Sequence, residues 1–179
     1  MAPPDRNKPD RDDLIIEHPN REKAGSKATK AIVILLLLVS VGLLVVATVG
    51  GWEKLAGAKP VQIAYIVLYL VFAFFVARWS RGVLPVASAL AIILLIFAAV
   101  SIPGWYDRDK DGFAETTLPP SVIGTICFII VIVQILLIAF AMRGFQQAWN
   151  VEVERAPDEP RGDRGDRRDD STGAIAAPA

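Results

Sequence analysis

The segment Asp107–Glu115 places carboxylates at alternate positions, in a pattern that could bind a metal ion. It begins D-R-D-K-D-G, which matches the first half of a calcium-binding loop, D-x-D-x-D-G. Carboxylates at this spacing converge on one hard cation, the glycine permits a sharp turn, and the following carbonyl supplies another oxygen. The candidate calcium ligands are Asp107, Asp109, Asp111, the Phe113 carbonyl and Glu115.

This match covers only half of a calcium loop. The twelfth position, which normally holds a bidentate glutamate, is Leu118. The sequence therefore favours a solvated turn in which Arg108 and Lys110 balance the acids. The alternative is weak calcium binding, with a Kd on the order of 10⁻⁴–10⁻³ M. No other cofactor is expected, because Cys127 and His18 are the only residues of their types and cannot build a haem or soft-metal site.

A second set of polar residues, the polar seam, lies inside apolar sequence and consists of Gln62, Tyr65, Tyr69 and Gln134. The first three share one face of a predicted helix, and Gln134 lies near the middle of another. A buried amide needs hydrogen-bond partners, and such bonds between membrane helices are worth about 0.6–2 kcal/mol. We interpret the seam as a packing contact, with a polar pathway or ligand groove as the alternative. The apolar stretches contain no Asp, Glu, Lys or Arg, which disfavours coupled ion or proton transport.

Four uncharged stretches carry these residues: Ala31–Trp52, Pro60–Ala77, Gly82–Tyr106 and Thr116–Met142. Each is about the 20 residues that a helix needs to cross a hydrocarbon core. The sequence therefore predicts an all-α membrane protein, an antiparallel four-helix transmembrane bundle with disordered charged termini. The predicted spans are residues 31–51, 61–79, 83–102 and 121–142.

Proline and glycine set the predicted helix ends. The third helix should stop before Pro103-Gly104, and the fourth should begin just after Pro119-Pro120. Good helix formers follow residue 142, so the fourth helix is expected to continue into the cytoplasm within a four-span domain of residues 31–155. On this extension Phe145 and Trp149 are four residues apart and could dock a partner.

The two ends of the chain are charged and poor in apolar residues. Residues 1–30 are rich in Pro, Asp, Arg and Lys, and residues 156–179 form a low-complexity Arg/Gly/Asp run. Neither can bury enough apolar surface to offset the entropy of ordering, so both are predicted to be disordered.

The distribution of basic residues predicts the orientation. Lys and Arg are concentrated in residues 1–30, 78–81 and 143–179, whereas the alternate loops hold only Lys54, Lys59, Arg108 and Lys110. Cytoplasmic loops carry the excess of Lys and Arg. We therefore expect both termini to be cytoplasmic. The Asn residues form no glycosylation sequon, which favours the inner membrane of a prokaryotic cell.

These features favour a protein that is not an enzyme, because no nucleophile–base pair or phosphate-binding loop is recognisable. The 19 basic and 19 acidic residues balance, which disfavours nucleic-acid binding. The leading hypothesis is an accessory or scaffold subunit whose partners are the lipid bilayer and a membrane protein or further copies of itself. The alternatives are a small transporter or channel-forming oligomer, and a weak calcium-binding envelope sensor that uses the loop after the third helix.

Overall fold

The computed structural model describes residues 15–55, 57–110 and 116–155. The predicted tail 156–179, most of the predicted tail 1–30, and the segment 111–115 lie outside these residues. Residues 18–151 form one compact unit, the helical unit, and residues 15–17 and 152–155 belong to another.

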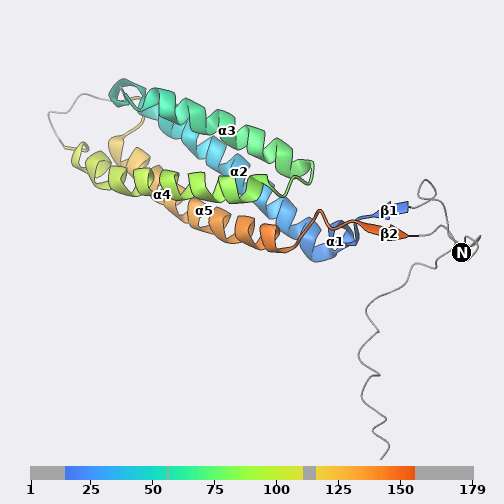
Figure 1. Cartoon of the computed structure of the whole chain (residues 1–179). Coiled ribbons are helices and arrows are strands. Elements are labelled where there is room, and N and C mark those ends of the chain that lie inside the picture. Colours follow the sequence, from blue (N-terminus) through green and yellow to red (C-terminus); the bar gives the residue numbers. More distant parts are fainter. Residues whose placement is uncertain (1–14, 56, 111–115, 156–179) are drawn as a thin grey trace, which may run out of the picture. The chain divides into compact units, whose positions relative to one another are not determined.

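The prediction of a helical protein is confirmed for the residues described. Four helices in this part of the chain are long and apolar enough to cross a membrane. They are α2 (Ala24–Gly50), α3 (Lys59–Ala77), α4 (Val83–Asp107) and α5 (Pro120–Gln146) (Figure 1).

Short elements flank the long helices. Helix α1 (Pro19–Glu22) precedes α2, and the 3₁₀ helix η2 (Trp52–Lys54) follows it. In the second unit, β1 (Ile15–Glu17) pairs antiparallel with β2 (Val153–Arg155), with Ile16 opposite Glu154. The prediction of a disordered chain through residue 30 is wrong for residues 15–30, most of which lie in β1, α1 and the start of α2. Branched side chains such as Ile16 favour an extended backbone.

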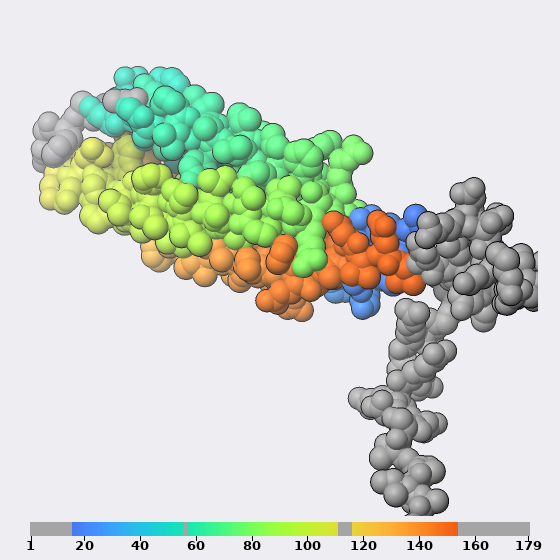
Figure 2. Space-filling model, in the orientation of Figure 1, coloured from blue at the N-terminus to red at the C-terminus, as the bar shows by residue number. Residues whose placement is uncertain are grey.

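The four long helices share one apolar core. Helix α2 packs against α3 and α5, and α4 packs along α5, whereas α3 and α4 contact each other sparsely. Figure 2 shows the face of the unit on which α3 and α4 lie side by side. We call the end that holds residues 51–58 and 108–119 the loop end, and the end that holds α1, residues 78–82 and residues 147–151 the terminal end.

Helix α4 does not stop before Pro103-Gly104, as the sequence predicted, but runs through both residues to Asp107. A proline inside a helix removes one backbone hydrogen bond. Packing outweighs this loss, because the last turn buries Trp105, whose ring lies over Gly51 with Cη2 only 2.8 Å from the place a Cβ would occupy. The next residue, Tyr106, lies over Gly124 in the same way.

The first and last long helices also differ from the predicted spans. Helix α2 begins at Ala24 rather than residue 31, because residues 24–30 pack against the terminal end through buried Ser26 and Thr29. Helix α5 extends only to Gln146. The predicted cytoplasmic extension ends there because the chain turns at Ala148, whose φ of 48° is left-handed, and buries Trp149 completely.

Candidate functional site

Two residues of the polar seam meet in the centre of the helical unit. The Tyr69 hydroxyl donates to Gln134 Oε1 at 2.9 Å, and Gln134 Nε2 donates to Ser40 Oγ at 3.0 Å. Ser40 in turn donates to the Leu36 carbonyl at 2.8 Å. All three polar side chains in this chain of bonds are fully buried. The seam therefore links α3, α5 and α2 by bonds between its own groups.

The other two seam residues bond elsewhere. The Tyr65 hydroxyl donates to the Leu90 carbonyl of α4 at 3.3 Å, and its ring stands edge-on to Tyr69. Gln62 Oε1 lies 2.6 Å from the Thr48 hydroxyl, which lies equally close to the Leu44 carbonyl. Thr48 has one proton, so a Gln62 amide turned to donate through Nε2 satisfies both contacts.

The geometry of the seam fits a packing contact between helices better than a polar pathway for a solute. In the Tyr69–Gln134–Ser40 chain, the hydroxyl and amide groups bond to one another, so they are not free to form hydrogen bonds with a passing solute. Tyr65 and Tyr69 are brought together because residues four apart lie on one face of a helix. Ser88 is also buried, but its hydroxyl has no hydrogen-bond partner among the described residues.

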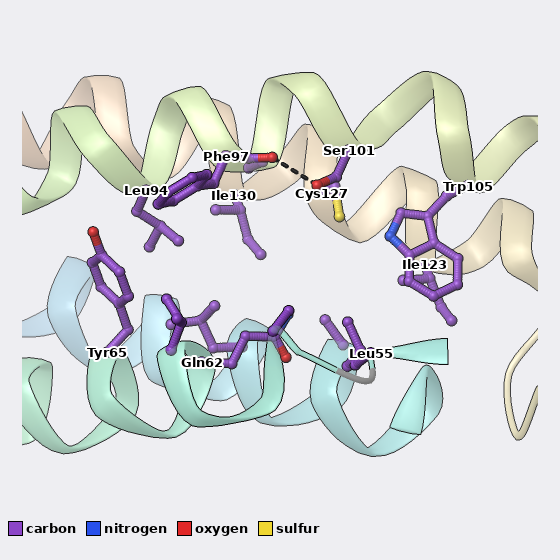
Figure 3. A pocket seen from close by; sticks show the side chains of 15 residues that line it. Leu55, Gln62, Tyr65, Leu94, Phe97, Ser101, Trp105, Ile123, Cys127 and Ile130 are labelled. Atoms are coloured by element: carbon purple, nitrogen blue, oxygen red, sulfur yellow. Dashed lines mark hydrogen bonds between the residues drawn. The ribbon is translucent and has the colours of Figure 1, made fainter. Parts of the chain in front are cut away.

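A cavity of about 220 Å³ lies beside the seam, towards the loop end. Figure 3 shows it between α3 and α4, with Tyr65 and Leu94 near one end and Leu55 and Trp105 near the other. Its walls are mostly apolar. The lining residues are Leu44, Ala47, Leu55, Ala58, Val61, Gln62, Tyr65, Leu94, Phe97, Ala98, Ser101, Trp105, Ile123, Cys127 and Ile130.

The cavity has a buried floor and an exposed rim. Leu44 of α2 and Ile123 of α5 are buried beneath it, whereas Val61 of α3 and Phe97 of α4 line it and are also exposed on the surface. The rim lies where α3 and α4 contact each other sparsely. The opening therefore faces sideways, out of the bundle.

A second, more open hollow of about 290 Å³ adjoins the cavity at the loop end. The two share Leu55, Ala58, Ser101 and Trp105. The second hollow is also lined by Lys54 and Arg108, and none of the described residues that line it is acidic. It is thus more polar and more basic than the cavity beneath it.

Three features make the second hollow attractive to an anion. Lys54 and Arg108 bring two positive charges, and Arg108 also lies over the Trp105 ring at 5.2 Å. The third is the start of α3, where the helix dipole favours negative charge. The backbone adds little to this, because the Lys59 N–H donates to the Leu55 carbonyl and Pro60 has no N–H.

The terminal end is built around Trp149. Its fully buried ring meets Trp79 edge-on at 5.4 Å, packs against Gly144, and donates from Nε1 to Gln147 at 3.0 Å. Lys30 Nζ lies 4.1 Å from the centre of the Trp79 ring. Trp149 therefore does not present a docking surface, contrary to the expectation from its spacing with Phe145.

Residues on either side of the long helices hold this end together. Arg21 Nε donates to the Trp149 carbonyl at 3.0 Å, and Asn20 Nδ2 donates to the Ala148 carbonyl at 3.2 Å. Gln147 Nε2 donates to the Thr29 hydroxyl at 3.0 Å. Helix α1 and the chain after α5 are thereby joined.

Only part of the candidate calcium site can be placed. Asp107 ends α4 and pairs with Lys110 at 3.0 Å, and both side chains are exposed. Asp111, Phe113 and Glu115 lie outside the described residues. Among the residues that are described, no group of three His, Cys, Asp or Glu could hold a metal ion. Calcium binding stays a prediction.

The sequence analysis offered a ligand groove along the seam as an alternative, and two seam residues, Gln62 and Tyr65, do line the cavity. Its other lining residues and the basic hollow were not anticipated, since they depend on which helices fail to meet. The nearest sequence signal is the pair of cations Lys54 and Arg108 in separate loops. Comparison with protein-family models, with curated proteins and with solved structures finds no match for this chain.

Proposed function

We propose that this chain is a multi-pass protein of the cell (inner) membrane that acts as an accessory or scaffold subunit, without catalysis of its own. In this proposal α2, α3, α4 and α5 cross the membrane as an antiparallel bundle with both termini in the cytoplasm. Their outward faces support it, because large apolar side chains such as Val49, Val67, Ile96 and Phe128 are exposed there. Apolar surface on this scale suits lipid or a partner rather than water.

The charges at the two ends support the orientation. Beside one described acid, Glu22, the terminal end carries basic residues from three separate segments: Arg21, Lys23, Lys27, Lys30, Arg78, Arg81 and Arg143. The described residues of the loop end mix Glu53, Asp107 and Asp109 with their basic residues. This excess of Lys and Arg supports a cytoplasmic position for the terminal end.

The observation that carries the accessory role is the ordered terminal end. The bonds from Arg21 and Asn20 and the burial of Trp149 fix helix α1 and residues 147–151 in one place. Two non-glycine residues there, Trp79 and Ala148, have left-handed backbones, which such packing must hold. The result is a rigid surface with exposed positive charges, suited to an acidic cytoplasmic segment of a partner membrane protein.

A pull-down tests this role. The chain is solubilised gently from its native membrane and isolated with an affinity tag, and the bound proteins are measured by mass spectrometry. We expect one unrelated membrane protein in stoichiometric amount. The double variant Lys27→Gln/Arg143→Gln should lose most of it, because both side chains are exposed at the terminal end. The control Lys110→Gln changes a charge at the loop end and should retain the partner.

Recovery of this chain alone, as a homogeneous oligomer, would contradict the accessory role and favour the transporter or channel alternative. That alternative predicts solute flux in liposomes that Gln134→Leu abolishes. The sensor alternative predicts calcium-dependent Trp105 fluorescence that Asp109→Asn removes. The transporter alternative has less support, since the central bonds of the seam join its own groups.

A further inference from the structure

The sideways-opening cavity and the basic hollow adjoin each other and differ in chemistry, and we call the two together the recess. The inner part is apolar, and the outer part is lined by Lys54 and Arg108. Ser101 and Trp105 line both parts, so a single molecule can occupy the two at once. A ligand that fits has an apolar tail and an anionic head.

The size of the recess fits one chain of a bilayer lipid. From Leu94 to Trp105 helix α4 rises about 16 Å, and from Ala58 to Tyr65 helix α3 rises about 10 Å. The apolar part therefore spans up to about half of a hydrocarbon core of roughly 30 Å, which is one leaflet. An engineered apolar cavity of about 150 Å³ binds benzene, so 220 Å³ holds part of one acyl chain and no more.

The position of the opening selects a lipid over a soluble ligand. The rim residues Val61 and Phe97 are exposed on the sides of α3 and α4, within spans long and apolar enough for the membrane. A lipid chain next to these helices can enter sideways without crossing water. It would cover exposed apolar area at the rim, on Val61 and Phe97.

The charges at the recess favour an anionic head group. Lys54 and Arg108 line the hollow together, and the neighbouring acid Asp107 is paired with Lys110. Glu53 and Asp109 are the other described acids beside them, and neither of these exposed side chains is part of the lining. A phosphate in the hollow would receive charge-assisted hydrogen bonds from the two cations and lie near the start of α3.

We propose that the helical unit binds one anionic phospholipid in this recess, with an acyl chain between α3 and α4 and the phosphate at Lys54 and Arg108. With both termini in the cytoplasm, this lipid comes from the outer leaflet. The proposal rests on the membrane placement given above but not on the accessory role. It gives the chain a specific lipid ligand, in addition to general solvation by the bilayer.

Binding is tested on the full chain in mild detergent, with phosphatidylglycerol or with phosphatidylcholine of the same acyl chains. Retained lipid is counted by native mass spectrometry, and lipid-induced thermal stabilisation is measured in parallel. We expect retention of one phosphatidylglycerol per chain, with a preference of roughly 10-fold over phosphatidylcholine.

Matched substitutions separate the head-group and chain contacts. Lys54→Gln and Arg108→Gln should each reduce the preference for phosphatidylglycerol, whereas Lys59→Gln, at the same end but outside the hollow, should not. Ala98→Phe fills the cavity and should reduce retention of both lipids about 10-fold. The same substitution at exposed, non-lining Ala99 should leave retention unchanged.

Ser101→Phe provides a second test of the cavity in case Ala98→Phe impairs folding, because Ser101 is exposed at the rim rather than buried. The proposal is overturned if the wild-type chain retains both lipids equally, or if folded Ala98→Phe and Ser101→Phe variants bind as the wild type does. It is also overturned if Lys54→Gln and Arg108→Gln keep the full preference. These results are independent of the pull-down, whose substitutions lie at the terminal end.

Discussion

At the scale of single residues, Gln134 is a fully buried amide among apolar side chains. Its oxygen accepts from Tyr69 and its nitrogen donates to Ser40, so both ends of the amide have partners. Removing one partner of a buried hydrogen bond is costly, because the polar group that remains is buried without a partner. The amide therefore stabilises one particular arrangement of α2, α3 and α5.

We expect Gln134→Leu to lower the free energy of unfolding by about 1–4 kcal/mol, because two interhelical hydrogen bonds are lost and the Tyr69 hydroxyl is left without its acceptor. The measurement is reversible unfolding in mixed micelles. Gln146→Leu, the same substitution at an exposed position of α5, is the control and should change little.

A double-mutant cycle makes this test more specific. If Tyr69 and Gln134 stabilise the protein through their shared bond, Tyr69→Phe should cost less in the Gln134→Leu background than in the wild type. Equal costs in the two backgrounds would show that the bond contributes nothing. That result would reopen the interpretation of the seam as a polar pathway.

At the scale of helices, close contacts at glycines determine how the elements meet. A Cβ at Gly144 would lie 3.1 Å from both Leu84 and Trp149, and these two side chains are fully buried. By contrast, nothing lies within 4 Å of the place where a Cβ would be at Gly42. The two glycines therefore have opposite roles in the same bundle.

We expect Gly144→Ala to destabilise the protein by about 1–3 kcal/mol, because neither buried neighbour has room to move. The control Gly42→Ala should be neutral or stabilising by about 0.5–1 kcal/mol, because alanine is the better helix former and meets no neighbour. The same unfolding assay measures both. Stabilisation by Gly144→Ala would contradict the packing described for Trp149.

Sequence patterns predicted the existence of the long helices better than their ends. Uninterrupted apolar runs determine where a helix can be buried, so all four appear close to the expected positions. The ends depend on tertiary packing. Trp105 over Gly51 extends α4 past Pro103, and the buried Trp149 ends α5 before the expected extension.

For the candidate sites too, local sequence patterns predicted some features, and tertiary packing determined the others. Spacing along one helix predicted that Tyr65 and Tyr69 share a face, and Gln134 stood out because an amide in apolar sequence needs partners. The recess beside them could not be predicted in this way. It arises where α3 and α4 diverge and where Lys54 and Arg108, from separate loops, line one hollow.

At the scale of the whole helical unit, charge and apolarity are separated along the helix axes. Charged side chains lie at the two ends, and the sides of the four long helices expose apolar residues. Polar interactions with a partner are therefore expected at the charged ends, and apolar interactions at the sideways opening and on the helix faces. The accessory role and the lipid site use different parts of that surface.

The membrane orientation connects these two proposals, and cysteine labelling tests it. In a Cys127→Ala background, Lys110→Cys and Lys27→Cys place single thiols at exposed positions of the loop end and the terminal end. We expect an impermeant maleimide to label Lys110→Cys on intact cells and Lys27→Cys only after permeabilisation, because an excess of basic residues favours the cytoplasmic side for the terminal end. The reverse pattern would refute both cytoplasmic termini and the cytoplasmic docking surface. The lipid recess would survive that result, but its ligand would then come from the inner leaflet.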